Sequence, residues 1–210
     1  AGKVTLENGN IVIQGRKVNI NRGTPALLAA AVKTSEALKQ EEPFGYLIGD
    51  IGRGDGSKKL YKYLVEHLKK TSFHTMAFHY LQPLVDWHNR ILAIITKMIP
   101  KPVLIADAGS MYMAKMSGKS AAYDLFTPDI GELAFLADEA APHPFYTRGF
   151  ILHEEHHAPD LIARAYAHGN ASEYLLVKGS KDYIVNSEGV QDIVDSPVEE
   201  SMEAIGGPGD

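Results

Sequence analysis

The last five residues of the chain, Gly206-Gly207-Pro208-Gly209-Asp210, combine two features that chemistry at a bound anion requires. Glycine lets the backbone approach an anion closely, because no Cβ stands in the way. A carboxylate at the end of such a run can act on a bound hydroxyl group. Glycine-rich turns that end in aspartate are also common as plain turns, so this motif needs support from the rest of the sequence.

Three further polar segments support it, because each comes directly after a predicted strand. They are Asp107 after residues 102–106, residues 127–132 after residues 123–126, and residues 178–180 after residues 174–177. The carboxyl ends of parallel strands meet at one edge of a sheet, and ligands bind in the crevice outside that edge. We therefore expect all three segments to face one crevice, and the terminal glycine run to join them.

The elements that must position these segments alternate between strand and helix patterns. The predicted strands are 44–48, 75–79, 102–106, 123–126, 174–177, 183–186 and 190–194, and the predicted helices are 24–39, 57–70, 84–98, 111–116, 133–138 and 160–168. This alternation predicts an α/β fold with a central, mainly parallel sheet and helices on both faces. Residues 102–106 are so apolar that we expect their strand to be buried on both sides.

Two glycine-containing regions near the N-terminus have other interpretations. Within residues 3–20, Asn8-Gly9 and Gln14-Gly15 interrupt alternating apolar and polar residues, which predicts short hairpins in an edge or lid ribbon. Residues 49–56 lie between a predicted strand and a predicted helix, where a phosphate or ribose could bind. Their glycine spacing fits neither the P-loop nor the dinucleotide-binding pattern, so we interpret them as a solvated turn.

Composition restricts the class of protein. With 210 residues, 45% hydrophobic and 22% charged, the chain resembles one ordinary globular domain over residues 1–210. A net charge of −5 gives no basic surface for nucleic acid, and no apolar run approaches the roughly 20 residues of a membrane span. Cysteine is absent, which excludes disulfides and a catalytic thiol. We predict a cytoplasmic protein whose partners are small molecules and leave its oligomeric state open.

A histidine cluster offers a rival site. The segment His153-Glu154-Glu155-His156-His157 satisfies the H-E-x-x-H pattern of zinc metalloproteases. Gly149 and Pro159 leave room for about one turn of helix between them, whereas such a zinc site needs a long helix to present both histidines. We therefore predict that the cluster holds no zinc and forms a loop or a flap near the substrate.

The four motifs together resemble the ribokinase-like superfamily, and within it the ADP- or ATP-dependent NAD(P)H-hydrate dehydratases. The likeness covers about residues 102–210, with a fainter echo in residues 22–30. It rests on a strand that ends in Asp107-Ala108, a Thr-Pro-x-x-Gly-Glu element at residues 127–132, a strand that ends in Lys178-Gly179, and a Gly-Gly-x-Gly-Asp signature at residues 206–210.

The resemblance implies a role for each matching residue. These roles are the catalytic base for Asp210, backbone donors to the phosphate for Gly207 and Gly209, nucleotide contacts for Lys178, Gly179 and Ser180, a water-mediated Mg²⁺ contact for Glu132, and substrate-side contacts for Asp107, Thr127 and Asp129. It also implies ATP or ADP as the phosphate donor and Mg²⁺ as the metal. In this superfamily a helix follows the aspartate, so we expect residues beyond Asp210 to complete the site.

Some residues depart from the family pattern. Pro208 has no N–H to donate, three glutamates at 199, 200 and 203 precede the glycine run, and Asp129 stands where histidine is usual. The leading hypothesis is an enzyme resembling NAD(P)H-hydrate dehydratase, in which a nucleotide phosphorylates the hydrate and phosphate then leaves. The alternatives are a small-molecule kinase acting on a sugar or hydroxymethyl compound, and a nucleotide-binding protein with weakened catalysis.

Overall fold

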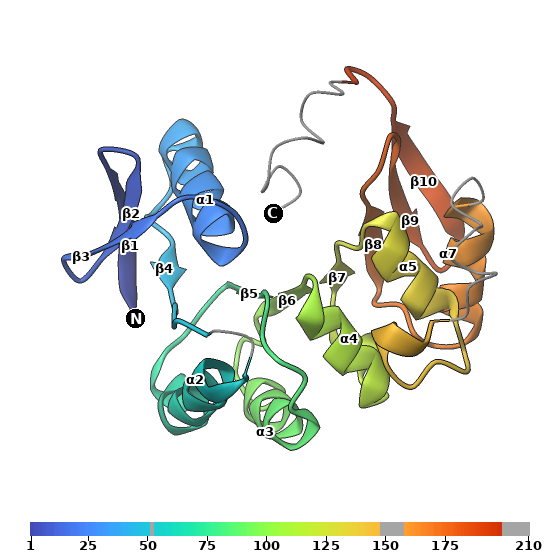
Figure 1. Ribbon diagram of the computed structural model, residues 1–210, viewed down its shortest axis with the longest axis horizontal. Helices are drawn as coiled ribbons and strands as arrows, with labels where there is room; N and C mark the ends of the chain where they lie inside the picture. The colour runs from blue at the N-terminus through green and yellow to red at the C-terminus, as the bar shows by residue number, and fades with distance from the viewer. Residues whose placement is uncertain (51–52, 148–157, 199–210) are drawn as a thin grey trace. The chain divides into compact units, whose positions relative to one another are not determined.

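The computed structural model describes residues 1–50, 53–147 and 158–198 (Figure 1). These residues form two compact units. Unit 1 is described over residues 1–50, and unit 2 is described over residues 53–147 and 158–198. The terminal glycine run and the histidine cluster at 153–157 lie outside the described residues. Within the ranges that are described, no helix is long and apolar enough to cross a membrane.

Unit 1 is an antiparallel sheet that packs against one helix. Its elements are β1 (Gly2–Glu7), β2 (Asn10–Ile13), β3 (Arg16–Asn19), α1 (Thr24–Leu38) and β4 (Phe44–Gly45), and the strand order is β3-β2-β1-β4. Val4, Ile11 and Ile13 of the sheet bury their side chains against Val32 of α1. Of the predicted strand 44–48, only Phe44 and Gly45 form a strand, β4.

Both predicted hairpin turns of unit 1 are confirmed. Asn8 and Gly9 have φ of 49° and 75°, and Gln14 and Gly15 have φ of 51° and 74°. Two successive residues with positive φ are characteristic of type I′ turns, whose twist matches that of the strands they join. The turn residues therefore set the register of β1, β2 and β3.

Unit 2 contains Asp107, residues 127–132 and residues 178–180, the polar segments that are expected to face one crevice. Its elements are α2 (Asp55–His67), η1 (Leu68–Lys70), β5 (Thr75–Phe78), α3 (Val85–Ile95), β6 (Val103–Ala106), α4 (Gly109–Met116), η2 (Ser120–Ala122), β7 (Leu125–Phe126), α5 (Ile130–Ala137), η3 (Pro144–Tyr146), α7 (Ala158–Ala167), β8 (Tyr174–Val177), β9 (Asp182–Asn186) and β10 (Gly189–Val194). The predicted helix 133–138 begins three residues earlier than expected, because Asp129 caps it.

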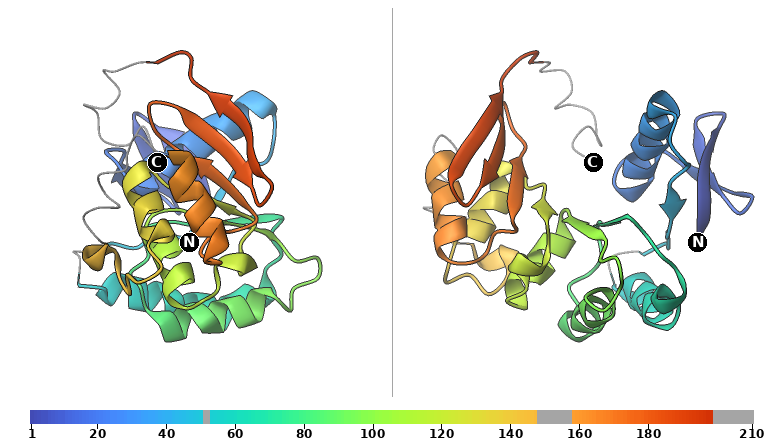
Figure 2. Two further views of the ribbon diagram at one scale, coloured as in Figure 1. Left: turned by 90° about the vertical axis from the view of Figure 1, so that its right-hand side faces the viewer. Right: turned by 180° about the vertical axis from the view of Figure 1, so that it is seen from behind.

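The sheet of unit 2 has the strand order β10-β9-β8-β7-β6-β5. Strands β5 to β8 are parallel and follow chain order, whereas β9 and β10 form an antiparallel hairpin at one edge. Helices α2, α3, α4, α5 and α7 contact one another in that sequence, as expected when right-handed crossovers step along a sheet in one direction (Figures 1 and 2). The prediction of an α/β fold with a central, mainly parallel sheet is confirmed.

The expected burial of residues 102–106 on both sides is wrong. In β6, Leu104 and Ala106 are buried, but Val103 is 41% exposed. β8 alternates in the same way, with Tyr174 44% exposed and Leu175 fully buried. Each strand thus turns alternate side chains toward the helices, and the strongly apolar sequence conceals this period of two.

A buried polar pair links helix α3 to the segment before β7. His88 Nε2 lies 2.9 Å from the hydroxyl of Tyr123, and the two rings are stacked. Burial lowers the pKa of His88 from 6.5 to about 4; nearby Lys119 acts in the same direction, and a hydrogen bond with Asn89 acts against it. His88 is therefore neutral in the folded protein at neutral pH.

We expect this histidine to make stability depend on pH. Because the folded pKa is depressed, the stabilisation is present above 6.5 and is lost as the pH falls from 6.5 to about 4, by up to about 3 kcal/mol. Urea unfolding of the wild type and of His88→Gln, at several pH values, measures this difference. Parallel stability curves for the two proteins across that range would contradict the assignment.

Candidate active site

Three neighbouring strands of unit 2 end at one edge of the sheet, and a polar residue continues each of them. Asp107 N–H donates to Phe78 O, Thr127 N–H donates to Ala106 O, and Lys178 N–H donates to Pro128 O. These bonds extend the pairing of β5 to β8 past the ends of the strands. The structure therefore brings together Asp107, Thr127 and Lys178, as their positions after strands predicted.

The carboxylate of Asp107 is the centre of this group. Its Oδ1 accepts hydrogen bonds from Thr127 Oγ1 at 2.7 Å and from Lys178 Nζ at 3.2 Å. Its Oδ2 lies 3.1 Å from Nε2 of His79, whose side chain is only 2% exposed. The side chain of Asp107 is itself 13% exposed, so one nearly buried carboxylate joins the ends of four strands.

The surroundings of Asp107 keep it ionised. Burial alone would raise the pKa of Asp107, but the close approach of His79, the hydrogen bond from Thr127, and the charge and hydrogen bond of Lys178 outweigh burial and hold the pKa below its ordinary value. By sequence position alone, Asp107 could have been a helix cap and Lys178 a strand-end lysine that extends into water, and the structure supports neither role. Ala108 rather than Asp107 is the N-cap of α4, and Lys178 is ion-paired rather than simply extended into water.

Asp129 and Glu132 form a capping box at the start of α5. Asp129 Oδ1 accepts from the Glu132 N–H at 2.7 Å, and Glu132 Oε2 accepts from the Asp129 N–H at 3.0 Å. The backbone of Asp129 also pairs with that of Lys178. The cap therefore places two carboxylates beside the cluster formed by Asp107, Thr127, Lys178 and His79.

Glu132 has an unusual environment for a carboxylate. Burial raises the pKa of Glu132 to about 7, and the charges of Asp129 and Asp107 add to this effect. Tyr112 donates to Glu132 Oε1 at 3.3 Å, and burial together with Glu132 raises the pKa of that tyrosine. A cation near Asp129 and Glu132 would relieve the repulsion between their carboxylates.

The donor set fits Mg²⁺ held mainly through water. Each oxygen of Glu132 already accepts one hydrogen bond and keeps capacity for a second. Over the part of the chain that is described, no group of three or more His, Cys, Asp or Glu side chains is placed to hold a metal ion. Mg²⁺ keeps several waters and uses one or two carboxylates plus substrate phosphates, so Glu132 and Asp129 suit it.

Two residues with strained backbone conformations also lie at this edge. Tyr80 and Ala108 have φ of 50° and 47°, a region that side chains with a Cβ rarely adopt. Each follows a member of the cluster, His79 or Asp107. A Cβ on Gly109 would lie 2.7 Å from Leu81 O, so the two loops pack closely. Such residues concentrate at functional sites, where the surrounding structure maintains them.

The remaining predicted site residues divide into two groups. Gly179 and Ser180 are exposed after Lys178, and the Gly179 N–H donates to Asp182 Oδ1 at 3.0 Å. Gly207, Gly209 and Asp210 lie outside the described residues. The contacts of His79 and Tyr112 were not predicted from the sequence. His79 is the last residue of a predicted strand, so the rule that selected Asp107 could have selected it too.

We expect Asp107→Asn to lower the free energy of unfolding by about 2–3 kcal/mol, because it removes a charge that Lys178 and His79 share in a poorly solvated place. Asp86→Asn, at an exposed position in the first turn of α3, is the matched control and should change stability by less than about 0.5 kcal/mol. Urea denaturation followed by circular dichroism measures both. Equal effects of the two substitutions would show that Asp107 does not hold the cluster together.

No known protein-family model matches the chain. Two solved structures show a distant similarity to the chain. A chain described as the last common ancestor of HMPPK and PLK/HMPPK vitamin kinases has a TM-score of 0.47 and 14% identity, over 84% of this chain and 79% of that one. Phosphofructokinase-2 from Escherichia coli, in complex with fructose-6-phosphate, has a TM-score of 0.37 and 16% identity, over 77% and 49%. Similarities this distant do not assign an activity to this chain.

A relative with much higher identity comes from Methanocaldococcus jannaschii. The uncharacterized protein MJ1337 is 39% identical over 185 residues, which are 88% of this chain and 75% of MJ1337. An identity of this size over most of both chains establishes common family membership. The chain therefore belongs to the family of MJ1337.

Proposed function

We propose that the protein is a nucleotide- and Mg²⁺-dependent kinase of the ribokinase-like type that phosphorylates a hydroxyl group of a small molecule. One observation carries this proposal: Lys178 is held 3.2 Å from Asp107, beside Asp129 and Glu132, at the carboxyl edge of a parallel sheet. A fixed cation next to a pair of carboxylates suits the phosphates of a nucleotide and the metal that accompanies them.

Lys178 would contact the phosphates. Its ammonium group has three N–H donors, and the bond to Asp107 fixes the direction in which the group points. Thr127 donates to the same oxygen of Asp107, and His79 lies 3.1 Å from the other oxygen, so this carboxylate cannot rotate freely. A positive charge oriented in this way stabilises charge that develops on a phosphoryl group without having to reorganise.

Asp129 and Glu132 would hold Mg²⁺ through its water ligands. The ion would neutralise charge on the phosphates while they are transferred. The chain's own contribution is the capping box, because it fixes both carboxylates to the first turn of α5. Tyr112 limits the motion of Glu132 further by its hydrogen bond to Oε1.

Asp210 would accept the proton of the substrate hydroxyl, and Gly207 and Gly209 would donate backbone N–H groups to the phosphoryl group. Support for these three roles comes from the glycine-rich sequence and its likeness to the superfamily motif.

The dehydratase hypothesis adds one step to the same chemistry. In that reaction the nucleotide phosphorylates the hydroxyl of NAD(P)H hydrate, and loss of phosphate then restores the reduced nicotinamide. The cluster at Asp107 accounts for the phosphoryl transfer and contains no group that selects a nicotinamide, so kinase activity is the simpler proposal. Nucleotide binding without turnover would indicate the third alternative, a protein with weakened catalysis.

The test is turnover with ATP or ADP and Mg²⁺ against a panel of sugars, hydroxymethyl compounds and NADPH hydrate. We expect a stable phosphorylated product, detected by phosphorus NMR, from a member of the alcohol panel. Recovery of the reduced-nicotinamide absorbance from the hydrate, without such a product, would favour the dehydratase. Absence of both products would refute an active kinase.

We expect Lys178→Met to lower kcat/KM at least about 10²-fold, because it removes the cation aimed at the transferring phosphoryl group. Lys181→Met is the matched control, since Lys181 lies three residues away, is 55% exposed and pairs only loosely with Asp195 at 3.9 Å. Steady-state kinetics with the substrate that the panel identifies measure both variants. If the two variants retain similar activity, Lys178 does not act on the phosphates.

Asp210→Asn tests the base. General-base help contributes typically about 10²–10⁴-fold, so turnover should fall by that factor while the nucleotide Kd changes little. Kinetics and nucleotide binding on the same preparation separate the two effects. Unchanged turnover would make Asp210 an ordinary turn residue.

A further inference from the structure

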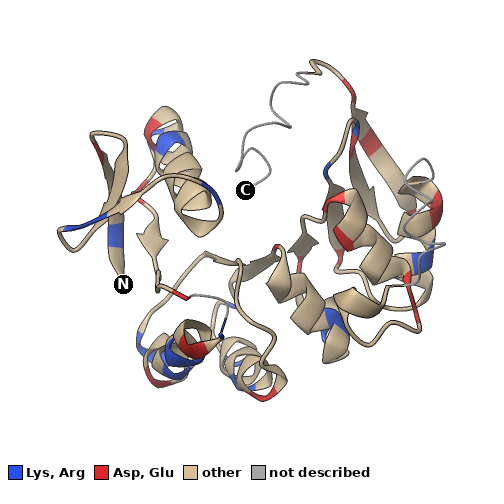
Figure 3. Cartoon of the chain, viewed as in Figure 1, with Lys and Arg blue, Asp and Glu red and all other residues tan. Residues whose placement is uncertain are grey.

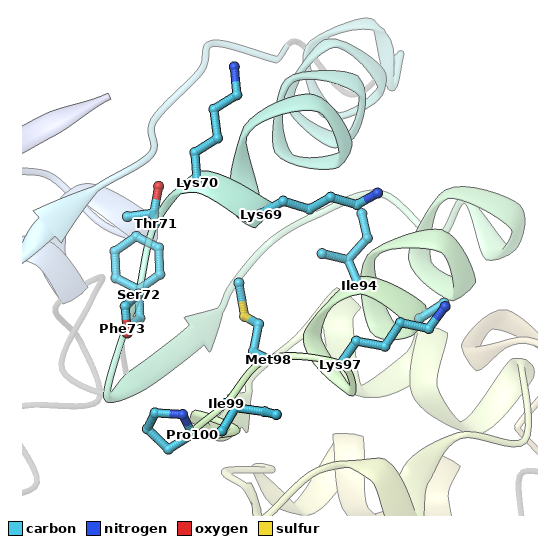
Figure 4. Close-up of a pocket in the computed structure, with 11 residues that line it drawn as sticks. Lys69, Lys70, Thr71, Ser72, Phe73, Ile94, Lys97, Met98, Ile99 and Pro100 are labelled. Carbon is cyan, nitrogen blue, oxygen red and sulfur yellow. The ribbon is translucent and has the colours of Figure 1, made fainter.

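A cavity of about 680 Å³ lies at the end of unit 2 opposite the candidate active site (Figure 4). Its lining comes from residues 69–73, just before β5, and from the end of α3 together with residues 97–100, just before β6. The cluster around Asp107 lies instead beyond the carboxyl ends of those strands. The volume falls within the range of about 300–1,000 Å³ that small-molecule sites occupy.

The charge of this cavity has one sign. Lys69, Lys70 and Lys97 line it, and no aspartate or glutamate does, in a chain whose net charge is −5. Within residues 1–50, 53–147 and 158–198, none of the three forms a salt bridge. Figure 4 shows Lys69 and Lys97 extending toward the same side, whereas Lys70 points elsewhere. Figure 3 shows basic residues gathered along α2, which leads into Lys69.

The rest of the lining is largely apolar. Phe73, Ile94 and Met98 contribute side chains to it, and Ile99 is 97% exposed. Because nearly the whole surface of Ile99 remains in water, its side chain contributes no burial free energy to folding. Burying this side chain against a ligand would be favourable. An apolar ligand body against Ile94, Met98 and Ile99 would supply that burial.

Helix polarity accounts for part of this arrangement. α2 with η1 ends at Lys70 and α3 ends at Ile95, so lysines near these ends interact favourably with the partial negative charge of the helix C-termini. That effect requires neither a concave apolar lining nor an exposed isoleucine beside it. The combination of the two is what points to a ligand.

From this juxtaposition we infer that the cavity is a second ligand site, distinct from the candidate active site, for a small organic anion with an apolar body. Lys69 and Lys97 contact the anionic group, and Ile94, Met98 and Ile99 contact the apolar part. The inference is independent of the kinase proposal, because it involves none of the residues around Asp107.

Two fluorescent probes of nearly equal shape test this site. 8-Anilinonaphthalene-1-sulfonate carries an anionic group on an apolar ring system, and N-phenyl-1-naphthylamine is its neutral counterpart. We expect saturable binding of one sulfonate per chain, and we expect it to weaken as salt rises because the lysines are exposed.

The decisive variant is Lys69→Met with Lys97→Met. Exposed charge contacts are individually weak, so removing both should raise the Kd of the sulfonate about tenfold and leave that of the neutral probe unchanged. Lys59→Met with Lys62→Met, at exposed positions of α2 outside the cavity, is the matched control and should change neither Kd. Circular dichroism verifies that both variants are folded.

Methyl NMR of the wild type gives a second measurement that does not depend on a variant. The sulfonate should shift the methyl signal of Met98 and leave those of Met111 and Met113, which are fully buried elsewhere, unchanged. The proposal is overturned if the sulfonate does not bind, if its Kd is the same in the lysine variant, if both probes weaken equally, or if Met98 does not respond.

Discussion

The ionised carboxylate of Asp107 is the constraint on which the rest of unit 2 depends. A charge that is 13% exposed must be compensated by partners, or the carboxyl group would protonate or the structure would open. Its partners come from the ends of β5, β7 and β8, and Asp107 itself follows β6. Four strands therefore need the correct register at the same time for one charge to be satisfied.

The same requirement explains why charged and polar side chains are concentrated at this edge. Hydrogen bonds to Asp107 fix Lys178 and Thr127, and the close loops at Tyr80 and Ala108 take up backbone conformations that are otherwise unfavourable. The many contacts around these residues fix the backbone conformation, and their favourable energy offsets the cost of the strain. A rigid edge of this kind can hold a cation and two carboxylates in a constant arrangement, which phosphoryl transfer requires.

The two ends of the unit 2 sheet differ in how their charges are balanced. At the carboxyl end, Lys178 is paired with Asp107, and Glu132 is bound by its own helix cap. At the amino end, Lys69 and Lys97 line a cavity without an acidic side chain. Charges that pair with each other stabilise the fold itself. Lysines that line a partly apolar cavity with no acidic side chain instead favour the binding of a negatively charged molecule.

The sequence by itself determined the α/β fold and the grouping of Asp107, Thr127 and Lys178, because alternating strand and helix patterns imply that parallel strands end together. It also determined the hairpin turns at Asn8-Gly9 and Gln14-Gly15, since positive φ is a local property. The capping box of Asp129 and Glu132 was not predicted, although an aspartate followed three residues later by a glutamate is a local pattern that could have shown it.

Only the tertiary structure decided the contact of His79 with Asp107, the exposure of Val103 in β6 and the raised pKa of Glu132. Each of these depends on which side chains from distant segments lie within a few ångströms and on how much water they exclude. A local sequence pattern records neither quantity, because burial and charge proximity arise only when separate elements pack.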